Sequence, residues 1–356
     1  MIKLSIIMSV IESTDYLIDS LNAITKQLNP DVELLLVNNQ LDEETSLLLT
    51  VYSTKDDGIR VIENNKKTLS SALNKAIIEA DGEYIYFADT NKQLLESSVE
   101  KILSSLQESK QDIILFRTSR NDEENELMEK ISRIVNDKAF DYEKLGKYFY
   151  KLESMPWNKV YNKEFLQENN LEFNENLIFD YENFFFKTFT QANGMRFINQ
   201  ELFVEDYKPK TAKKFENSIN SYINTLQLEK LDRYELYNSM MQKSKDTHDN
   251  IPVDQKQLSF IVLREFAKNI LNSNISTTFL ENLNKENRKL FELIVISENA
   301  EEYEILERTY NNSLEVNYLK RYEKVLRIER DKLRNFNNSL VSSNSWKLTK
   351  VFRIFK

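Results

Sequence analysis

Short apolar runs of strand length alternate with segments of helical period through the first part of the chain, and this alternation restricts the fold more than any other feature. The runs are KLSIIMSV at 3–10, VELLLV at 32–37, IRVIE at 59–63, EYIYFA at 83–88 and DIILF at 112–116. Helical spacing of apolar residues recurs around residues 16–24, 69–77 and 99–106. Nearly continuous apolar strands that alternate with amphipathic helices predict an α/β fold with a mainly parallel sheet covered on both faces.

Polar side chains follow several of these runs at the points where the strands should end. The segments concerned are Asn38 to Asp42 and Asp89 to Lys92. In a parallel α/β sheet the carboxyl ends of the strands meet at one edge, and ligands bind in the crevice there. We therefore expect both segments to face the same crevice.

Composition excludes several classes of function. The chain has no cysteine, which rules out disulfides and thiolate metal sites, and its single histidine, His248, rules out sites built from several imidazoles. A net charge of −9 argues against nucleic acid as a partner. No apolar run approaches the roughly 20 residues that span a bilayer, so we expect a cytoplasmic protein.

The remaining sequence suggests further parts after the first sheet. Aromatic residues are dense from 152 to 205, the pattern turns helical after about 212, and residues 300–340 are rich in Glu, Lys, Arg and Leu. We predict an α/β domain at 1–207 with halves 1–117 and 118–207, a helical region at 208–299, a long amphipathic helix at 300–343 and a basic amphipathic tail at 344–356.

Several longer motifs occur in a characteristic order. They are LSIIMSVIESTDYLIDSLNAITKQ, VELLLVNN, LSSALNKAI, ADGEYIYFAD and PWNKVYNKEFLQENNLEFNENLIFDYENFFFK. In this order they resemble the family 2 glycosyltransferases, over half of the chain. The resemblance implies the Rossmann-like GT-A fold, an inverting transfer from a nucleotide-sugar donor to a glycan acceptor, and a Mg²⁺ or Mn²⁺ ion.

The resemblance also assigns residue roles, although several polar positions depart from the family pattern. It places Ser9, Glu12, Asn39, Asp89 and Asn91 at the donor, Trp157 and Asn158 at the acceptor, and Asp89 and Asn91 at the metal. Family members usually have an acid at position 39, a glycine and an arginine near Thr68 and Leu73, and an acid at position 91. The usual base position holds Tyr181, so Asp180 and Glu182 are the nearest catalytic candidates.

Each assignment has a structural alternative. Asp89 and Asn91 form a weak metal site, or Asp89 caps the turn after its strand. Asp180 and Glu182 provide the catalytic base, or they stabilise the start of the helix that follows. Trp157 contacts a sugar, or it packs in the core while Asn158 and Lys159 fix the loop.

Two functions follow from these alternatives. The first is a glycosyltransferase of cell-surface polysaccharide or glycan assembly, with activity impaired by the altered acids. The second is a catalytically silent relative that binds a glycan, a nucleotide or a partner glycosyltransferase. The basic tail at 344–356, with Trp and Phe among its lysines, further predicts peripheral contact with the inner face of the cell membrane.

Overall fold

The computed structural model divides the chain into two compact units, Met1–Pro252 and Val253–Lys356. It describes residues 2–11, 16–66, 68–106, 110–118, 122–178, 180–205, 211–226 and 228–311. The predictions for Glu12, for the basic tail and for most of the 300–343 helix lie outside these residues. The predicted domain boundary at 207 stays a prediction.

Within the described residues, a seven-stranded sheet organises the first unit, in the order β3-β2-β1-β4-β7-β6-β8. Its strands are β1 (Leu4–Val10), β2 (Val32–Asn38), β3 (Ile59–Glu63), β4 (Tyr84–Ala88), β6 (Ile113–Phe116), β7 (Lys159–Asn162) and β8 (Met195–Ile198). Every neighbouring pair is parallel except those that include β7. The five predicted strands and the mainly parallel α/β fold are therefore confirmed.

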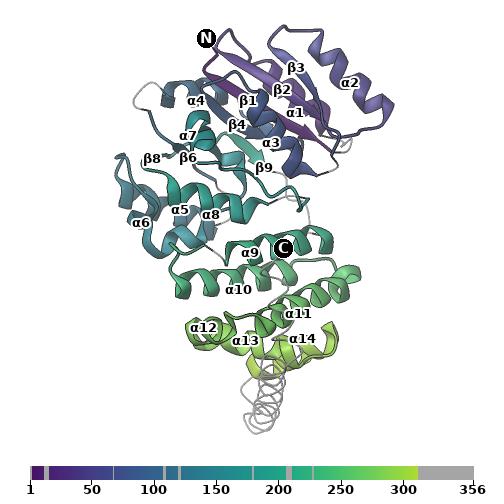
Figure 1. Cartoon of the computed structure of the whole chain (residues 1–356), viewed down its shortest axis with the longest axis vertical. Helices are drawn as coiled ribbons and strands as arrows, with labels where there is room; N and C mark the ends of the chain where they lie inside the picture. The colour runs from purple at the N-terminus through teal and green to yellow at the C-terminus, as the bar shows by residue number, and fades with distance from the viewer. Residues whose placement is uncertain are drawn as a thin grey trace, which may run out of the picture. The chain divides into compact units, whose positions relative to one another are not determined.

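The order of the strands creates a switch point beside β1. The chain builds β2 and β3 on one side of β1 and then returns to add β4 on the other side, as Figure 1 shows. Leu4 pairs with Val32 of β2 and with Tyr84 of β4, so the three strands run in register to one edge. Crevices at such switch points are the usual ligand sites of open α/β sheets.

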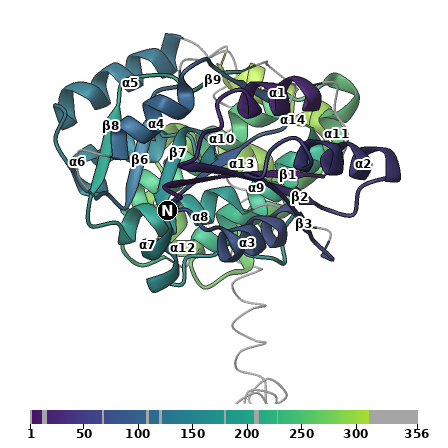
Figure 2. The same ribbon diagram turned by 90° about the horizontal axis from the view of Figure 1, so that it is seen from above.

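Helices cover both faces of this sheet, which explains why its strands are apolar throughout. One face carries α1 (Leu17–Thr25), α2 (Glu43–Ser53) and α4 (Ser98–Leu106), and the other carries α3 (Leu69–Glu79) and α8 (Tyr181–Gln191) (Figure 2). Leu4, Ile6 and Met8 of β1 pack into the cluster beneath the first group. On the opposite face, Phe87 of β4 contacts Phe184 of α8 with ring centroids 6.5 Å apart.

Further elements complete the first unit. They are a small antiparallel pair, β5 (Lys92–Leu94) and β9 (Phe203–Glu205), the helices α5 (Asp122–Val135), α6 (Tyr142–Leu145), α7 (Lys163–Glu168), α9 (Ala212–Thr225) and α10 (Arg233–Asp249), and the 3-10 turns Gly146–Lys151 and Pro156–Asn158. The polar stretch around 120–140 is thus largely a helix, and it buries Met128, Ile131 and Val135.

The second unit is helical over its described part. Its elements are the 3-10 turn Val253–Gln255 and the helices α11 (Lys256–Asn272), α12 (Ser276–Asn282), α13 (Lys285–Ile296) and α14 (Ala300–Asn311). The apolar run LFELIVISE at 290–298 lies largely in α13, because its apolar residues fall on one buried helical face. None of the described helices is both long and apolar enough to traverse a bilayer.

Candidate functional site

Asp89 begins a tight turn at the carboxyl end of β4. Its Oδ1 accepts hydrogen bonds from the backbone N of Asn91 at 2.9 Å and from Asn91 Nδ2 at 3.3 Å. Lys92 N donates to the carbonyl of Asp89, and Ser20 Oγ of α1 donates to the carbonyls of Thr90 and Lys92. The turn is therefore fixed from within and from α1, and Asp89 has the contacts expected of a capping residue.

The same contacts test whether a divalent cation fits here. A carboxylate only accepts hydrogen bonds, so the contact from Asn91 Nδ2 turns the amide oxygen of Asn91 away from Asp89. Asp89 Oδ2 accepts no hydrogen bond from the described residues, which also contain no cluster of three or more His, Cys, Asp or Glu able to hold a metal ion. Mg²⁺ is often held by one carboxylate together with substrate phosphates. The residues fit a cation only in that form, with Asp89 as the protein ligand.

Amide side chains gather at the ends of β2 and β3. Asn39 is 5% exposed, and its Oδ1 accepts a hydrogen bond from Asn64, which also donates to Ser71 Oγ at 3.1 Å. Asn38 Nδ2 donates to Ser46 Oγ and to Glu63. We call Asn39, Asn64 and Ser71 the amide cluster. Asn64 and Ser71 were not predicted as site residues, although Asn64 directly follows the third strand and Ser71 lies in the motif LSSALNKAI.

The two positions near the donor-side helix that depart from the family pattern have structural roles. Thr68 is the N-cap of α3, and its Oγ1 accepts from Ser71 N at 3.1 Å. Leu73 is 4% exposed and lies in the core. Neither side chain contributes a charge to the crevice.

Tyr181, at the predicted base position, lies within electrostatic reach of Asp89. Its ring packs edge-on against Trp157, with centroids 5.1 Å apart and planes at 76°. Burial raises the pKa of the Tyr181 hydroxyl well above its usual value, and the negative charge of Asp89 adds to this effect. Tyr181 is therefore protonated at neutral pH, and Trp157, which it contacts, is half-buried.

Asn158 and Lys159 fix the loop that carries Trp157. Lys159 is 0% exposed, and its Nζ donates to Glu153 O at 2.7 Å, Met155 O at 2.6 Å and Asn158 Oδ1 at 2.7 Å. Asn158 Nδ2 in turn donates to the carbonyl of Phe116 at 3.1 Å. Both side chains thus make the contacts of the loop-fixing alternative.

Asp180 joins three parts of the acceptor half. Its side chain is fully buried and accepts hydrogen bonds from Asn174 N at 3.0 Å, Asn183 Nδ2 at 3.0 Å and Ser221 Oγ at 2.8 Å. Asp180 occupies the N-cap position of α8, but its carboxylate makes no capping bond to that helix. The carboxylate is therefore held by the preceding loop, a side chain of α8 and α9.

Glu182 lies on a different side of α8, as a helical step of about 100° requires. Burial raises the pKa of its carboxyl to about 7, against a smaller lowering by a hydrogen bond from Ser218 and by the charge of Lys243. Its Oε2 has no hydrogen-bond partner among the described residues. Glu182 therefore faces α9 and α10, and it exchanges its proton near neutral pH.

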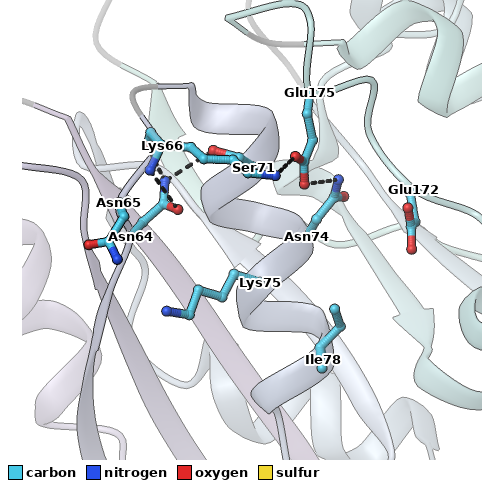
Figure 3. A pocket seen from close by; sticks show the side chains of 9 residues that line it. All are labelled: Asn64, Asn65, Lys66, Ser71, Asn74, Lys75, Ile78, Glu172 and Glu175. Atoms are coloured by element: carbon cyan, nitrogen blue, oxygen red, sulfur yellow. Dashed lines mark hydrogen bonds and ion pairs between the residues drawn. The ribbon is translucent and has the colours of Figure 1, made fainter.

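A cavity of about 300 Å³ opens beside α3 (Figure 3). Its lining residues are Asn64, Asn65, Lys66, Ser71, Asn74, Lys75, Ile78, Glu172 and Glu175. Lys66 forms an ion pair with Glu175, and Asn74 Nδ2 also donates to that carboxylate. The lining includes Asn64 and Ser71 of the amide cluster but none of the site residues that the sequence predicted.

Sequence comparison gives one family and several relatives. Residues 5–203, more than half of the chain, match the family described as Glycosyl transferase family 2. Glycosyltransferase GlyG of Streptococcus pneumoniae serotype 4 is 24% identical over 217 residues, which cover 56% of this chain and 69% of that protein. The uncharacterized glycosyltransferase EpsJ of Bacillus subtilis is 21% identical over 210 residues, which cover 58% and 61%.

Solved structures share the fold at low sequence identity. S. aureus TarS 1–349 superposes with a TM-score of 0.61 and 16% identity over 87% of this chain and 92% of that one, and a complex of the same protein holds UDP-GlcNAc. The mannosyltransferase PcManGT of Pyrobaculum calidifontis, in complex with GDP-Man and Mn²⁺, gives a TM-score of 0.53 and 13% identity over 82% and 84%.

Proposed function

Because the chain belongs to glycosyltransferase family 2, whose donors are nucleotide sugars, we propose that it transfers a glycosyl group to a hydroxyl of a glycan acceptor in cell-surface polysaccharide or glycan assembly. The observation that carries the proposal is the convergence of Asp89 with Tyr181 and Trp157. One carboxylate from the donor half and an aromatic pair from the acceptor half approach each other at the switch point of the sheet.

We assign the donor side to Asp89 and Lys92. The reaction breaks the bond between the anomeric carbon and the diphosphate, so negative charge develops on the leaving nucleoside diphosphate. A bound Mg²⁺ or Mn²⁺ neutralises such charge, and Asp89 would hold it through Oδ2. Lys92 supplies a second positive charge in the same turn, and its Nζ lies 5.0 Å from the ring centroid of Phe203.

The acceptor side must take a proton. The acceptor oxygen forms the new bond to the anomeric carbon while its proton passes to a base. Glu182 has a pKa of about 7, which suits a base at neutral pH. However, the side chains that interact with it, Ser218 and Lys243, belong to α9 and α10. Asp180 is held by three hydrogen bonds. Trp157 offers a ring to the acceptor sugar, with Asn158 fixing its loop.

The contacts of Asp180 favour a second candidate function. Three structural hydrogen bonds hold the carboxylate of Asp180, so it is not free to turn toward an acceptor hydroxyl, and Tyr181 beside it stays protonated. A protein with this arrangement binds a nucleotide, a glycan or a partner glycosyltransferase without turnover. In that case this chain keeps the fold for recognition of a ligand or partner and not for catalysis.

A turnover assay separates the two functions. Wild-type protein is incubated with UDP-, GDP- and CDP-sugars, with and without a glycan acceptor and Mn²⁺, and release of the nucleoside diphosphate is measured. Release that requires the acceptor supports the transferase. Nucleotide binding in isothermal titration, without any release, supports the silent relative and would overturn the transferase.

We also propose that the basic tail at 344–356 brings the protein to the inner face of the cell membrane. Its sequence NSWKLTKVFRIFK holds four basic residues and no acid, whereas the whole chain carries a net charge of −9. A local basic patch with Trp and Phe is what an acidic protein needs to approach an anionic membrane surface.

A further inference from the structure

The loop of residues 152–158, which we call the Trp157 loop, is tied to α10 at its first residue. Lys243 Nζ of that helix donates a hydrogen bond to the carbonyl of Leu152 at 2.8 Å. Farther along the loop, the ring of Trp157 packs against Tyr181 of α8, with centroids 5.1 Å apart. The place of the Lys243 ammonium group therefore bears on the contact between this loop and α8.

Glu182, in the first turn of α8, is buried beside the same loop and the next two helices. Ser218 of α9 donates a hydrogen bond to its carboxyl group, and Lys243 of α10 and Glu153 of the loop act on it through their charges. Lys243 favours ionisation of Glu182, and Glu153 opposes it. Tyr222 of α9 also faces Glu182, but burial raises the pKa of the Tyr222 hydroxyl well above its usual value, so it stays protonated. All of these residues belong to the first unit.

The hydrogen bonds of Glu182 suit a protonated carboxyl group. The side chain is 4% exposed, and its Oε2 has no hydrogen-bond partner among the described residues. A buried carboxylate with an unpaired oxygen costs far more free energy than a neutral carboxyl group in the same place. On losing its proton, Glu182 therefore needs a donor for Oε2. Lys243 carries the positive charge that acts on it, and in this structure that ammonium group is bonded to Leu152.

We propose that Glu182 and Lys243 form a proton-controlled switch on the Trp157 loop. While Glu182 holds its proton, Lys243 stays on the carbonyl of Leu152 and the loop is fixed. When the proton passes to solvent, the ammonium group moves to Glu182 Oε2, so Leu152 loses its donor and the loop is released. The switch itself does not depend on the proposed function. Its consequence does, because Trp157 is the ring that we assign to the acceptor sugar.

The fluorescence of Trp157 tests the switch in the full chain. Trp346→Phe leaves Trp157 as the single tryptophan. Its emission and its quenching by acrylamide are followed from about pH 5.5 to about pH 8.5. We expect one transition centred near pH 7, with stronger quenching above it, because the released loop exposes the ring.

Two substitutions in this background should abolish the transition in opposite ways. Glu182→Gln keeps the shape of the side chain but cannot ionise, so the emission should stay that of the low-pH form at every pH. Lys243→Met removes the donor to Leu152, so the emission should stay that of the high-pH form. Lys245→Met is the matched control, because Lys245 lies on the same helix and pairs with Asp249. This control should keep the transition.

His248 is the other group of α10 to be tested, because histidine ordinarily titrates near neutral pH. His248→Gln should keep the transition. An emission that does not change with pH in the parent, a transition that persists in Glu182→Gln or Lys243→Met, or one that is lost in His248→Gln would overturn the switch, provided that circular dichroism shows the variant to be folded. These results leave the proposed function untouched, because release of the nucleoside diphosphate is measured separately.

Discussion

Replacing Glu182 by Gln should change the pH dependence of stability in a defined way. Glu182 is 4% exposed, and burial raises the pKa of its carboxyl to about 7. Glutamine has nearly the same shape and can keep the hydrogen bond with Ser218, but it does not titrate. The substitution therefore removes the ionisation and leaves the packing almost unchanged.

The sign follows from the protons bound by each state. Between pH 4.5 and about 7 the folded protein keeps the proton of Glu182 and the unfolded chain has lost it. This contribution to stability is full below pH 4.5 and is lost as the pH rises through about 7. The difference between the two pKa values corresponds to about 3 kcal/mol, and most of this free energy of unfolding disappears between pH 5 and pH 8.

Urea unfolding at pH 5 and pH 8 measures the effect. Trp346→Phe serves as the background, because the chain has only two tryptophans and Trp157 then reports alone on the region of Tyr181. Glu182→Gln should be more stable than its parent by about 2 to 3 kcal/mol at pH 8 and nearly equal to it at pH 5. Exposed Glu216→Gln is the matched control and should follow the parent. If the parent and Glu182→Gln lose the same stability between the two pH values, the reasoning is refuted.

Three other expectations concern the loop, the metal and the tail. Lys159→Met leaves the half-buried carbonyls of Glu153 and Met155 without their donor and should cost about 3 kcal/mol in urea unfolding. The exposed control Lys147→Met should cost little, and equal losses in both variants would show that the contacts are unimportant. Asp89→Asn should abolish any gain in nucleotide affinity on adding Mn²⁺, and a gain that persists would place the ion elsewhere. Deleting residues 344–356 should remove sedimentation with anionic vesicles, and unchanged sedimentation would discard membrane contact.

The sheet could be predicted from sequence where its strands are long and buried on both faces. The five apolar runs became β1 to β4 and β6 because no other element accommodates such runs between helices. Strand β7 was not predicted, since KVYN has four residues and places Lys159 in a fully buried position. The lysine is tolerated there only because two carbonyls and an amide oxygen surround its ammonium group. Those acceptors belong to a loop whose conformation cannot be predicted from a sequence pattern.

Only the site residues that directly follow strands could be predicted from the sequence. Asp89 and Asn39 each follow a strand, so their position at one edge of the sheet was predictable from the alternation of apolar runs and helical segments. The direction in which the amide of Asn39 points was not predictable, because it depends on Asn64 and the backbone of Lys66, 25 and 27 residues along the chain. The engagement of Asp180 with Ser221 likewise needs α9 packed against α8.

The changes at the crevice act together on its charge. Members of the family usually have acids at the positions of Asn39 and Asn91, whereas this chain has amides there, and Lys92 follows the second of them. Amides keep hydrogen-bonding capacity but remove negative charge, so positions 39 and 91 add no second carboxylate to Asp89, and Lys92 adds a positive charge three residues along the chain. A diphosphate then meets less repulsion before any cation binds, while a cation meets less attraction. Nucleotide binding by this crevice should therefore depend less on a divalent metal than binding by a site with the full acid set, and more on hydrogen bonds to the base.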